Sequence, residues 1–393
     1  MSRIAFYSHD TFGLGHLRRC LKLARAIRSS VLVTEGLILT GSPWANLFSL
    51  PPEFELVRLP SVVKHGPTYV PRDKHCGLDS LMAARGRRIA RTLDSFRPDL
   101  LVVDNVPCGL LGEVLPAMRE LKLRPDIRCV LALRDVLDRP GAIHAEWTAA
   151  GAEEALATIY DEVWVFGDGE AMHAMTSLPG MSAVPRVQCG RIGLDLSDAV
   201  VTADEPSLDR RITAKSQPTI LVSGGGGGDA DALVRIYVDM LRSVGPLVWS
   251  RIVLGPDFPD AVLNEIRLNN GFTSRIDTFV PNLPAAMKDA DLVVAMAGYN
   301  TICEIEAVGS RALLVPRVWP RQEQLIRAHA QRRAGRAHVL HPEDLQPESL
   351  WTAIESALAQ PRPEPLEHRG GAVAARRAAL LLNREMSKKE VRI

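Results

Sequence analysis

The chain lacks the features that mark membrane-spanning, secreted and nucleic-acid-binding proteins. No apolar run approaches the roughly 20 residues that a membrane-spanning helix requires. Lysine and arginine together number 47 against 46 for aspartate and glutamate, and this balance gives no support for nucleic acid as a partner. The first residues, MSRIAFYSHD, are too polar for a secretion signal. We therefore expect a cytoplasmic protein that is at most peripheral to the inner face of the membrane.

Cysteine is scarce and poorly placed for covalent or metal cross-links. No two cysteines form a CxxC pair, and none is spaced with histidine as in a zinc site. The pattern argues against a disulfide framework and suits a reducing compartment. The six cysteines are Cys20, Cys76, Cys108, Cys129, Cys189 and Cys303.

The sequence does contain a regular alternation of short apolar runs and longer helical patterns, which is typical of α/β proteins with parallel sheets. The expected strands of the first half are residues 3–8, 31–40, 100–104, 127–133 and 162–166. Those of the second half are residues 219–223, 248–254, 275–280, 292–295 and 312–315. Each series opens with a strand that runs into a glycine-rich turn and a helix, so we expect two Rossmann-like domains.

A polar stretch with little apolar periodicity separates the two series. We therefore predict an N-terminal domain over residues 1–193, a linker over 194–217 and a C-terminal domain over 218–365. Residues 366–393 contain one further helical pattern, rich in arginine and alanine, over 367–384. That helix is either solvated or packs back on the first domain.

A run of five glycines, residues 224–228, follows the expected strand at 219–223 and precedes a helical pattern. Uncovered amides at the positive end of a helix dipole attract phosphate. We therefore interpret Gly224, Gly225, Gly226 and Gly227 as a phosphate-binding loop. The alternative is a flexible loop in which Asp229 merely caps the helix.

A second strand-to-helix junction lies at residues 296–304. Gly298 permits a tight turn, Asn300 and Thr301 offer hydrogen-bond donors to a phosphate, and Glu304 is able to accept two hydrogen bonds from a diol such as ribose. The alternative is a capping box formed by Thr301 and Glu304, which needs no ligand.

A third junction, residues 316–328, brings Glu323 and Gln324 to the start of a helix. A carboxylate beside an amide is suited to gripping sugar hydroxyls by paired hydrogen bonds. The alternative is an ordinary solvated helix start.

Taken together and in this order, the three junctions resemble the donor signature of GT-B glycosyltransferases, including the bacterial N-acetylglucosamine transferase of peptidoglycan synthesis and related family 28 enzymes. The resemblance covers residues 219–334. It is echoed by residues 11–16, TFGLGH, which are similar to the GGTGGH loop of the peptidoglycan enzyme. The matching residues are Phe279-Val280-Pro281-Asn282, Ala297-Gly298-Tyr299-Asn300-Thr301 with Glu304, Pro316 and Glu323-Gln324.

The resemblance implies a GT-B architecture, with two Rossmann-like domains facing across a cleft, the acceptor on the first domain and the donor on the second. The backbone near Phe279 and Val280 would contact the base. The glycine loop with Asn300 and Thr301 would hold the diphosphate, Glu304 the ribose, and Glu323 and Gln324 the transferred sugar. Uridine is the favoured base. The chain departs from many relatives at Met296, where they carry a histidine, and at Glu323-Gln324, which leaves the sugar open.

The expected acceptor side is the loop between the first strand and the first helix, where Gly13 and Gly15 would line the site. His16 is a candidate general base for an acceptor hydroxyl, because histidine accepts protons near neutral pH. Asp10 is a second candidate, either as the base or as the group that orients His16, and Asp135 is a third. The alternative for His16 is a structural role at the helix start.

We expect neither a metal nor a cofactor. Asp229-Ala230-Asp231 has the letters of a metal-binding Asp-x-Asp motif, but we place it in the first turn of a helix, where carboxylates favour the dipole. Amides and a helix end are able to stabilise a diphosphate leaving group instead.

The sequence thus predicts a metal-independent glycosyltransferase of the hexosyltransferase class. Its partners would be a nucleotide-sugar donor, such as a UDP-linked hexose or N-acetylhexosamine, and a hydroxyl acceptor, with a lipid-linked sugar as one candidate. A UDP-sugar 2-epimerase of the same fold and an inactive nucleotide-sugar-binding protein are the alternatives. Arg85, Arg87, Arg88 and Arg91 are spaced along one helical face, which we interpret as solvated rather than as an anion site.

Overall fold

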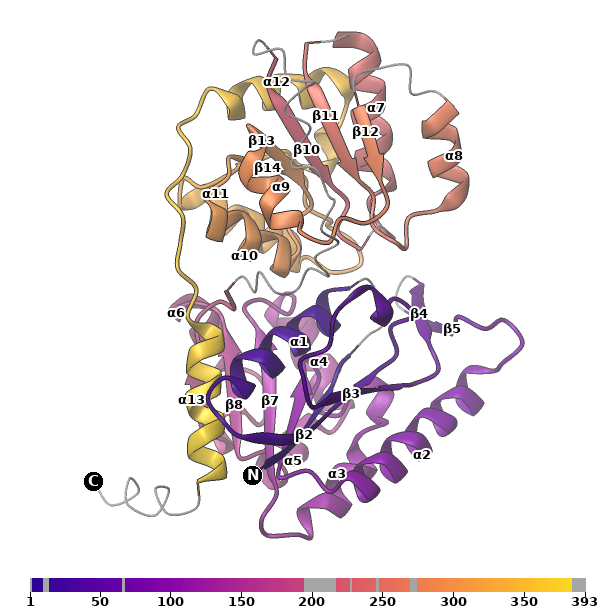
Figure 1. Ribbon diagram of the computed structural model, residues 1–393, viewed down its shortest axis with the longest axis vertical. Helices are drawn as coiled ribbons and strands as arrows, with labels where there is room; N and C mark the ends of the chain where they lie inside the picture. The colour runs from indigo at the N-terminus through magenta and orange to yellow at the C-terminus, as the bar shows by residue number, and fades with distance from the viewer. Residues whose placement is uncertain are drawn as a thin grey trace. The chain divides into compact units, whose positions relative to one another are not determined.

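The computed structural model describes residues 2–9, 14–65, 68–193, 217–226, 228–244, 247–268 and 274–383 (Figure 1). The chain divides into two compact units. Unit 1 comprises Met1–Gly193 with His368–Ile393, and unit 2 comprises Leu194–Glu367. Unit 1 contains a parallel sheet of seven strands and unit 2 a parallel sheet of six. The predicted α/β class with two parallel sheets is confirmed.

The sheet of unit 1 has the strand order β3-β2-β1-β6-β7-β8-β9. Its inner strands β6 and β8 consist of residues that are all buried, because helices cover both faces of a parallel sheet. The strands are β1 (Ser2–Tyr7), β2 (Val33–Thr40), β3 (Phe54–Arg58), β6 (Leu100–Asp104), β7 (Arg128–Arg134), β8 (Glu162–Phe166) and β9 (Arg186–Gln188). The edge strands β3 and β9 were not predicted.

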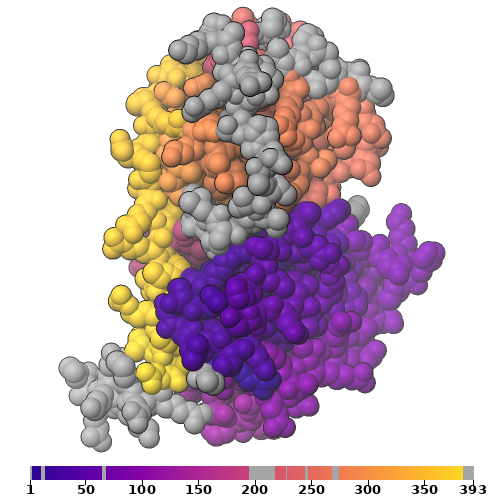
Figure 2. All heavy atoms as spheres, in the orientation of Figure 1, coloured from indigo at the N-terminus to yellow at the C-terminus, as the bar shows by residue number. Residues whose placement is uncertain are grey.

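The helices of unit 1 carry apolar faces that complete its core. Ile89 of α2 and Met118 of α3, for example, pack in one cluster with Ala5 and Tyr7 of β1. The α-helices are α1 (Gly15–Arg28), α2 (Leu78–Phe96), α3 (Leu115–Lys122), α4 (Pro140–Ala149), α5 (Ala152–Thr158) and α6 (Gly169–Met175). An antiparallel hairpin of β4 (Val62–His65) and β5 (Thr68–Pro71) precedes α2. The purple segment around β5 and the start of α2 projects at the edge of Figure 2.

The C-terminal helix α13 (Gly370–Leu382) belongs to unit 1 and packs on α1. A Cβ added at Gly371 would lie 3.2 Å from Cβ of Ala26, so a small residue suits this crossing. Arg377 donates to Glu162, the first residue of β8, with Nε 3.3 Å from Oε2. Glu162 also accepts a hydrogen bond of 2.7 Å from Nε1 of Trp164. Figure 1 shows α13 in yellow beside β8.

The sheet of unit 2 has the strand order β12-β11-β10-β13-β14-β15. Its strands are β10 (Thr219–Ser223), β11 (Trp249–Val253), β12 (Ser274–Asp277), β13 (Leu292–Ala295), β14 (Ala312–Leu314) and β15 (His338–Val339). Its α-helices are α7 (Asp231–Val244), α8 (Asp260–Leu268), α9 (Leu283–Asp289), α10 (Tyr299–Val308), α11 (Glu323–Arg333) and α12 (Pro347–Leu358). In the described part of the chain no helix is long and apolar enough to cross a membrane.

Two expected boundaries in unit 2 are wrong. The strand expected at residues 275–280 ends at Asp277, so Phe279 and Val280 lie in the connection to α9. Helix α7 begins at Asp231, so Asp229 precedes the helix and does not belong to its first turn. Asp229 is therefore part of the glycine-rich connection itself.

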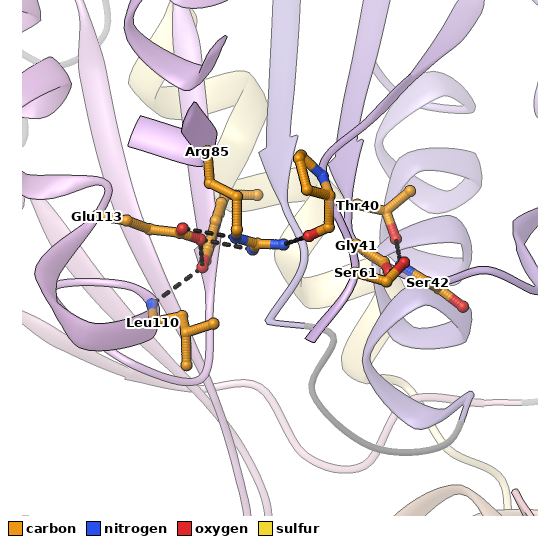
Figure 3. A network of polar contacts seen from close by, with 9 residues as sticks. Thr40, Gly41, Ser42, Ser61, Arg85, Leu110 and Glu113 are labelled. Atoms are coloured by element: carbon orange, nitrogen blue, oxygen red, sulfur yellow. Dashed lines mark hydrogen bonds and ion pairs between the residues drawn. The ribbon is translucent and has the colours of Figure 1, made fainter. Parts of the chain in front are cut away.

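The expectation of a solvated arginine face on α2 is wrong for Arg85. Arg87, Arg88 and Arg91 are exposed, but the side chain of Arg85 is only 1% exposed. Its Nε and Nη2 atoms donate hydrogen bonds of 2.7 and 2.6 Å to the carboxylate of Glu113 (Figure 3). A bidentate contact of this kind satisfies both buried charges, which explains why an arginine is tolerated in the core.

The Arg85–Glu113 pair connects several loops at the carboxyl end of the sheet. Glu113 accepts a hydrogen bond of 2.7 Å from the hydroxyl of Tyr7, which in turn accepts one of 3.0 Å from the amide of Leu110. Arg85 Nη1 also donates to the carbonyl of Pro60 at 2.5 Å. The next residue, Ser61, donates to the carbonyl of Gly41, as Figure 3 shows. The network thus ties the connections that follow β2, β3 and β6 to Tyr7, the last residue of β1.

We predict that Glu113→Gln lowers the free energy of unfolding of unit 1 by about 3–5 kcal/mol, because Arg85 would keep a buried charge without its carboxylate. Urea unfolding followed by circular dichroism measures the change. Arg88→Gln, on an exposed position of the same helix, is the matched control and should change stability by less than about 0.5 kcal/mol. If the two substitutions lower the free energy of unfolding equally, the prediction for the buried Arg85–Glu113 pair is wrong.

Candidate functional site

Each sheet has a point at which the strand order reverses direction along the chain. In unit 1 the reversal lies between β1 and β6, and in unit 2 it lies between β10 and β13. The loops after the two strands at such a point leave in opposite directions, and ligands of open α/β sheets bind at the crevice outside their carboxyl ends. The residues that follow β1, β6, β10 and β13 are therefore candidates for the functional site.

At the reversal in unit 1, His16 of α1 lies against the last residue of β6. Nδ1 of His16 is 2.6 Å from Oδ2 of Asp104, and Nε of Arg19 donates to Oδ1 of the same carboxylate at 2.7 Å. Asp104 and Arg19 are buried, and the side chain of His16 is 12% exposed. The ring of His9 lies edge-on to that of His16, with the centroids 5.6 Å apart.

The charges around Asp104 decide how His16 is oriented. Burial by itself raises the pKa of Asp104, but the neighbouring Arg19 and His16 outweigh it and hold the pKa well below its usual range. An ionised carboxylate only accepts hydrogen bonds, so Nδ1 of His16 carries the hydrogen. The other ring nitrogen, Nε2, is then the atom that accepts a proton. This is the arrangement of a histidine base held by a carboxylate.

Sequence reasoning considered Asp10 as the partner of His16 and missed Asp104. Asp104 ends an apolar strand, LLVVD, and a carboxylate at that position was the available signal. Asp10 and Gly13 lie outside the described residues, and Gly15 is the first residue of α1. Asp135, the third candidate base, is 3% exposed, and its Oδ2 atom lies 3.2 Å from Nη1 of Arg191. A role for Asp135 in proton transfer stays a prediction.

Two further polar atoms at this reversal lack a hydrogen-bond partner among the described residues. They are Oγ of Ser8, directly after β1, and Oδ1 of Asn105, directly after β6. Asn105 has a φ of 70°, a left-handed backbone conformation that asparagine tolerates better than most residues. Because buried polar atoms are nearly always satisfied, these two are candidates to contact a polar ligand.

At the reversal in unit 2, three loops leave three neighbouring strands at the same edge. The glycine loop follows β10, α10 follows β13, and residues 315–322 follow β14. The structure therefore brings together the three segments that the sequence suggested separately. Within the described ranges no group of three or more His, Cys, Asp or Glu side chains is placed to hold a metal ion.

The glycine loop needs glycine for two separate reasons. A Cβ on Gly224 would lie 2.6 Å from the carbonyl oxygen of Leu254 and 2.9 Å from Cβ of Ala230, which is too close for any side chain. Gly225 has a φ of 61°, in the left-handed region that other residues avoid. Gly226 accepts a backbone hydrogen bond of 3.0 Å from Asp257. Gly227 lies outside the described residues.

The start of α10 does not form the capping box that the sequence allowed. Gly298 is the N-cap, so Thr301 is the third residue of the helix and is not its cap. Asn300 and Thr301 lie in the first turn and are partly exposed, while Glu304, one turn further on, is buried. The positive end of the α10 dipole thus lies at the carboxyl edge of the sheet, as in helix ends that bind an anion.

The start of α11 is buried, so the alternative of a solvated helix start is wrong. Glu323 is 3% exposed and Gln324 is 8% exposed. Arg317 pairs with Glu323, and its backbone amide donates to Oε1 of Gln324 at 3.2 Å. From the next turn of α11, Nη1 of the buried Arg327 donates to the carbonyl of Ala297 at 2.7 Å, which ties α11 to the loop before α10.

Phe279 and Val280 follow β12, which is the edge strand and is separated from β10 by β11. Val280 is buried and Phe279 is half-buried. The connection continues into α9, whose N-cap Asn282 accepts a hydrogen bond of 3.1 Å from the amide of Ala285. Helix α9 packs against α10. A role for this connection in binding a base stays a prediction.

Comparison with protein families identifies the domain that contains the sheet of unit 2. Residues 219–380 match the model of the "Glycosyltransferase family 28 C-terminal domain". Over 259 residues the chain is 30% identical to the UDP-N-acetylglucosamine--N-acetylmuramyl-(pentapeptide) pyrophosphoryl-undecaprenol N-acetylglucosamine transferase of Glaesserella parasuis serovar 5, covering 64% of this chain and 70% of that protein. For three further transferases of that name, the chain spans 45%, 39% and 43% of the relative's length.

Solved structures share the fold across nearly the whole chain. MurG of Acinetobacter baumannii aligns with a TM-score of 0.55 and 17% identity, covering 96% of this chain and 95% of that chain. A putative UDP-N-acetylglucosamine 2-epimerase from Listeria monocytogenes aligns with a TM-score of 0.63 and 12% identity, covering 98% and 97%. At these identities the likeness establishes the GT-B fold alone.

We predict that Asp104→Asn destabilises unit 1 by about 3–5 kcal/mol near pH 7, because Arg19 would stay charged in the interior without a carboxylate. The pKa of Asp104 in the folded protein lies below the value of about 3.9 expected in the unfolded chain. Its stabilising contribution is therefore present above about pH 4 and is lost as the pH falls through the lowered folded-state pKa.

Urea unfolding of the wild type and of Asp104→Asn, repeated between neutral and acid pH, measures this contribution. The stability difference between the two proteins should shrink progressively below about pH 4. Asp94→Asn, on an exposed position of α2, is the control and should follow the wild type. A difference that does not change with pH would contradict the role given to the Asp104 charge.

Proposed function

The chain belongs to glycosyltransferase family 28 and is a nucleotide-sugar transferase of the GT-B fold, and from this premise we propose a specific reaction. The proposed donor is a UDP-linked hexose or N-acetylhexosamine, and the proposed acceptor carries a hydroxyl group. The transfer needs no metal ion. The donor occupies the carboxyl edge of the unit 2 sheet, and the acceptor hydroxyl is activated at His16 in unit 1.

One observation carries the proposal on the donor side. The glycine loop, the start of α10 and the start of α11 leave the neighbouring strands β10, β13 and β14 at one edge of the sheet. A nucleoside diphosphate sugar needs an anion site between a diol site and a sugar site. The glycine loop and the N-terminus of α10 suit the diphosphate, Glu304 the ribose, and Glu323 with Gln324 the sugar.

The proposed chemistry is a displacement at the anomeric carbon of the donor sugar. Nε2 of His16 accepts the proton of the acceptor hydroxyl while that oxygen forms a bond to the anomeric carbon. The bond from the anomeric carbon to the diphosphate breaks, and UDP leaves with the electron pair. Asp104 stabilises the histidine as it becomes positively charged, and the amides of unit 2 stabilise the departing diphosphate.

A lipid-linked sugar is the favoured acceptor class. The name of these relatives describes a transferase that acts on a pyrophosphoryl-undecaprenol-linked sugar. At 30% identity this supports the class of acceptor for the present chain rather than the individual molecule. A UDP-sugar 2-epimerase remains the second candidate, since solved proteins of that kind share the fold. An epimerase would convert the donor with no acceptor present, and a transferase would not.

The donor site is tested by isothermal titration of the purified protein with UDP, TDP and GDP in metal-free buffer. UDP should bind most tightly. Glu304→Ala should weaken UDP binding by about 10- to 100-fold, because a hydrogen bond to a charged group is worth about 1.5–3 kcal/mol. Gln324→Ala should affect the UDP-sugar more than UDP. Glu348→Ala, an exposed carboxylate at the start of α12, is the control. Wild-type affinity in Glu304→Ala would refute the donor assignment.

The catalytic base is tested by following UDP release with a polyprenyl-diphosphate-linked sugar as acceptor. His16→Ala should leave UDP affinity unchanged and lower the transfer rate by about 10²- to 10⁴-fold, the usual contribution of a general base. His173→Ala, an exposed histidine of α6, is the matched control. If His16→Ala transfers sugar at the control rate, another group takes the proton.

A further inference from the structure

Arg317, which follows β14, lies between two carboxylates at the carboxyl edge of the unit 2 sheet. Its Nη1 atom is 3.4 Å from Oδ2 of Asp229, and its Nη2 atom pairs with Oε1 of Glu323. The resemblance to GT-B glycosyltransferases includes Pro316 before Arg317, and Glu323 and Gln324 after it. It assigns no role to Arg317 itself. Asp229 likewise had only the role of a helix cap, but it lies two positions before Asp231, the first residue of α7, and Ala230 occupies the N-cap position.

The position of Arg317 connects the two ends of the proposed donor site. Asp229 closes the glycine loop, and Glu323 and Gln324 open α11. Arg317 contacts both segments, since its backbone amide also donates to Oε1 of Gln324. The guanidinium is thus held where a diphosphate on the glycine loop would meet a sugar at α11.

The guanidinium of Arg317 is shared between two acidic side chains. Two carboxylates face one guanidinium, and Glu323 is almost completely buried. Burial raises the pKa of Asp229, an effect that the charge of Arg317 opposes. The Nε atom of Arg317 is also buried and has no hydrogen-bond partner among the described residues. Arg317 thus brings a positive charge and a buried N–H group to the end of the glycine loop, where a phosphate would accept a hydrogen bond.

We propose that Arg317 is a donor-binding residue that contacts the diphosphate, and that Asp229 and Glu323 hold it in place until the donor binds. The inference rests on the function proposed above. When the diphosphate enters, the planar guanidinium makes paired hydrogen bonds to phosphate oxygens, a geometry that arginine favours. Glu323 is then released to accept hydrogen bonds from the sugar hydroxyls. Arg317 would also stabilise the negative charge on UDP as the bond to the sugar breaks.

The test compares UDP and uridine as probes, because only UDP carries the diphosphate. Arg317→Gln should weaken UDP binding by about 10- to 100-fold, in line with loss of a charge-assisted contact, and should change uridine binding by less than about 3-fold. Arg332→Gln, on an exposed position of α11, should bind both probes like the wild type. Equal UDP binding in the two variants would overturn the proposal.

A second comparison excludes the simpler role in which Arg317 only neutralises its two neighbours, and it avoids leaving a buried charge unpaired. The variant Asp229→Asn/Glu323→Gln retains Arg317, and adding Arg317→Gln removes it from the same neutral surroundings. We expect the double variant to bind UDP at least as tightly as the wild type and the triple variant to bind it about 10- to 100-fold more weakly. Equal binding by the double and triple variants would show that Arg317 serves only to neutralise the carboxylates.

The wild type separates failure of this inference from failure of the proposed function. If the wild-type protein binds none of UDP, TDP and GDP, the donor site itself is wrong, and the role of Arg317 falls with it. If the wild type binds UDP and Glu304→Ala weakens that binding while Arg317→Gln does not, the donor site stands and only the role of Arg317 is refuted.

Discussion

The arrangement of both units depends on one constraint, the reversal of strand order within a parallel sheet. Parallel strands all end at the same edge, and the loops that follow two strands on either side of a reversal must part. His16 and Asp104 meet at the reversal in unit 1, although 88 positions separate them in the sequence. In unit 2 the glycine loop and α10 follow the two strands on either side of the reversal. The topology of the sheets thus determines where the candidate sites lie, and the side chains of the loops determine what binds or reacts there.

Ion pairs between carboxylates and arginines are a second feature of the carboxyl edges of the two sheets. Asp104 with Arg19 and Glu113 with Arg85 each place a carboxylate and a guanidinium inside the protein, and the buried Glu323 pairs with the partly exposed Arg317. Such pairs add little net stability over apolar packing, because desolvation offsets most of their attraction. Their hydrogen bonds instead fix the orientation of the loops and side chains around them. Arg85 and Glu113 brace loops, and Asp104 sets which nitrogen of His16 accepts a proton.

The sequence predicted the central strands well and the periphery poorly. Strands such as β6 and β8 are continuous apolar runs because both of their faces are covered, and that pattern is readable directly. The strands β3, β9 and β15 are short or half-exposed, so no comparable run marks them. Arg85 was expected in solvent because helical spacing identifies a face of α2 but says nothing about a buried partner on another segment. In the same way, the spacing of Thr301 and Glu304 allowed a capping box at the start of α10. The structure excludes it because the N-cap is Gly298.

The amino-acid sequence by itself determined the α/β class, the two series of strands, the glycine loop and the ordered residues of the donor signature. These features are local, since each is set by hydrophobic periodicity or by the conformational needs of a short segment. Only the tertiary structure decided that Asp104 is the partner of His16, that α13 belongs to unit 1, and that Arg317 joins Asp229 to Glu323. Each of those contacts joins segments whose spacing along the chain carries no signal, because the contact arises only when folding brings the segments together.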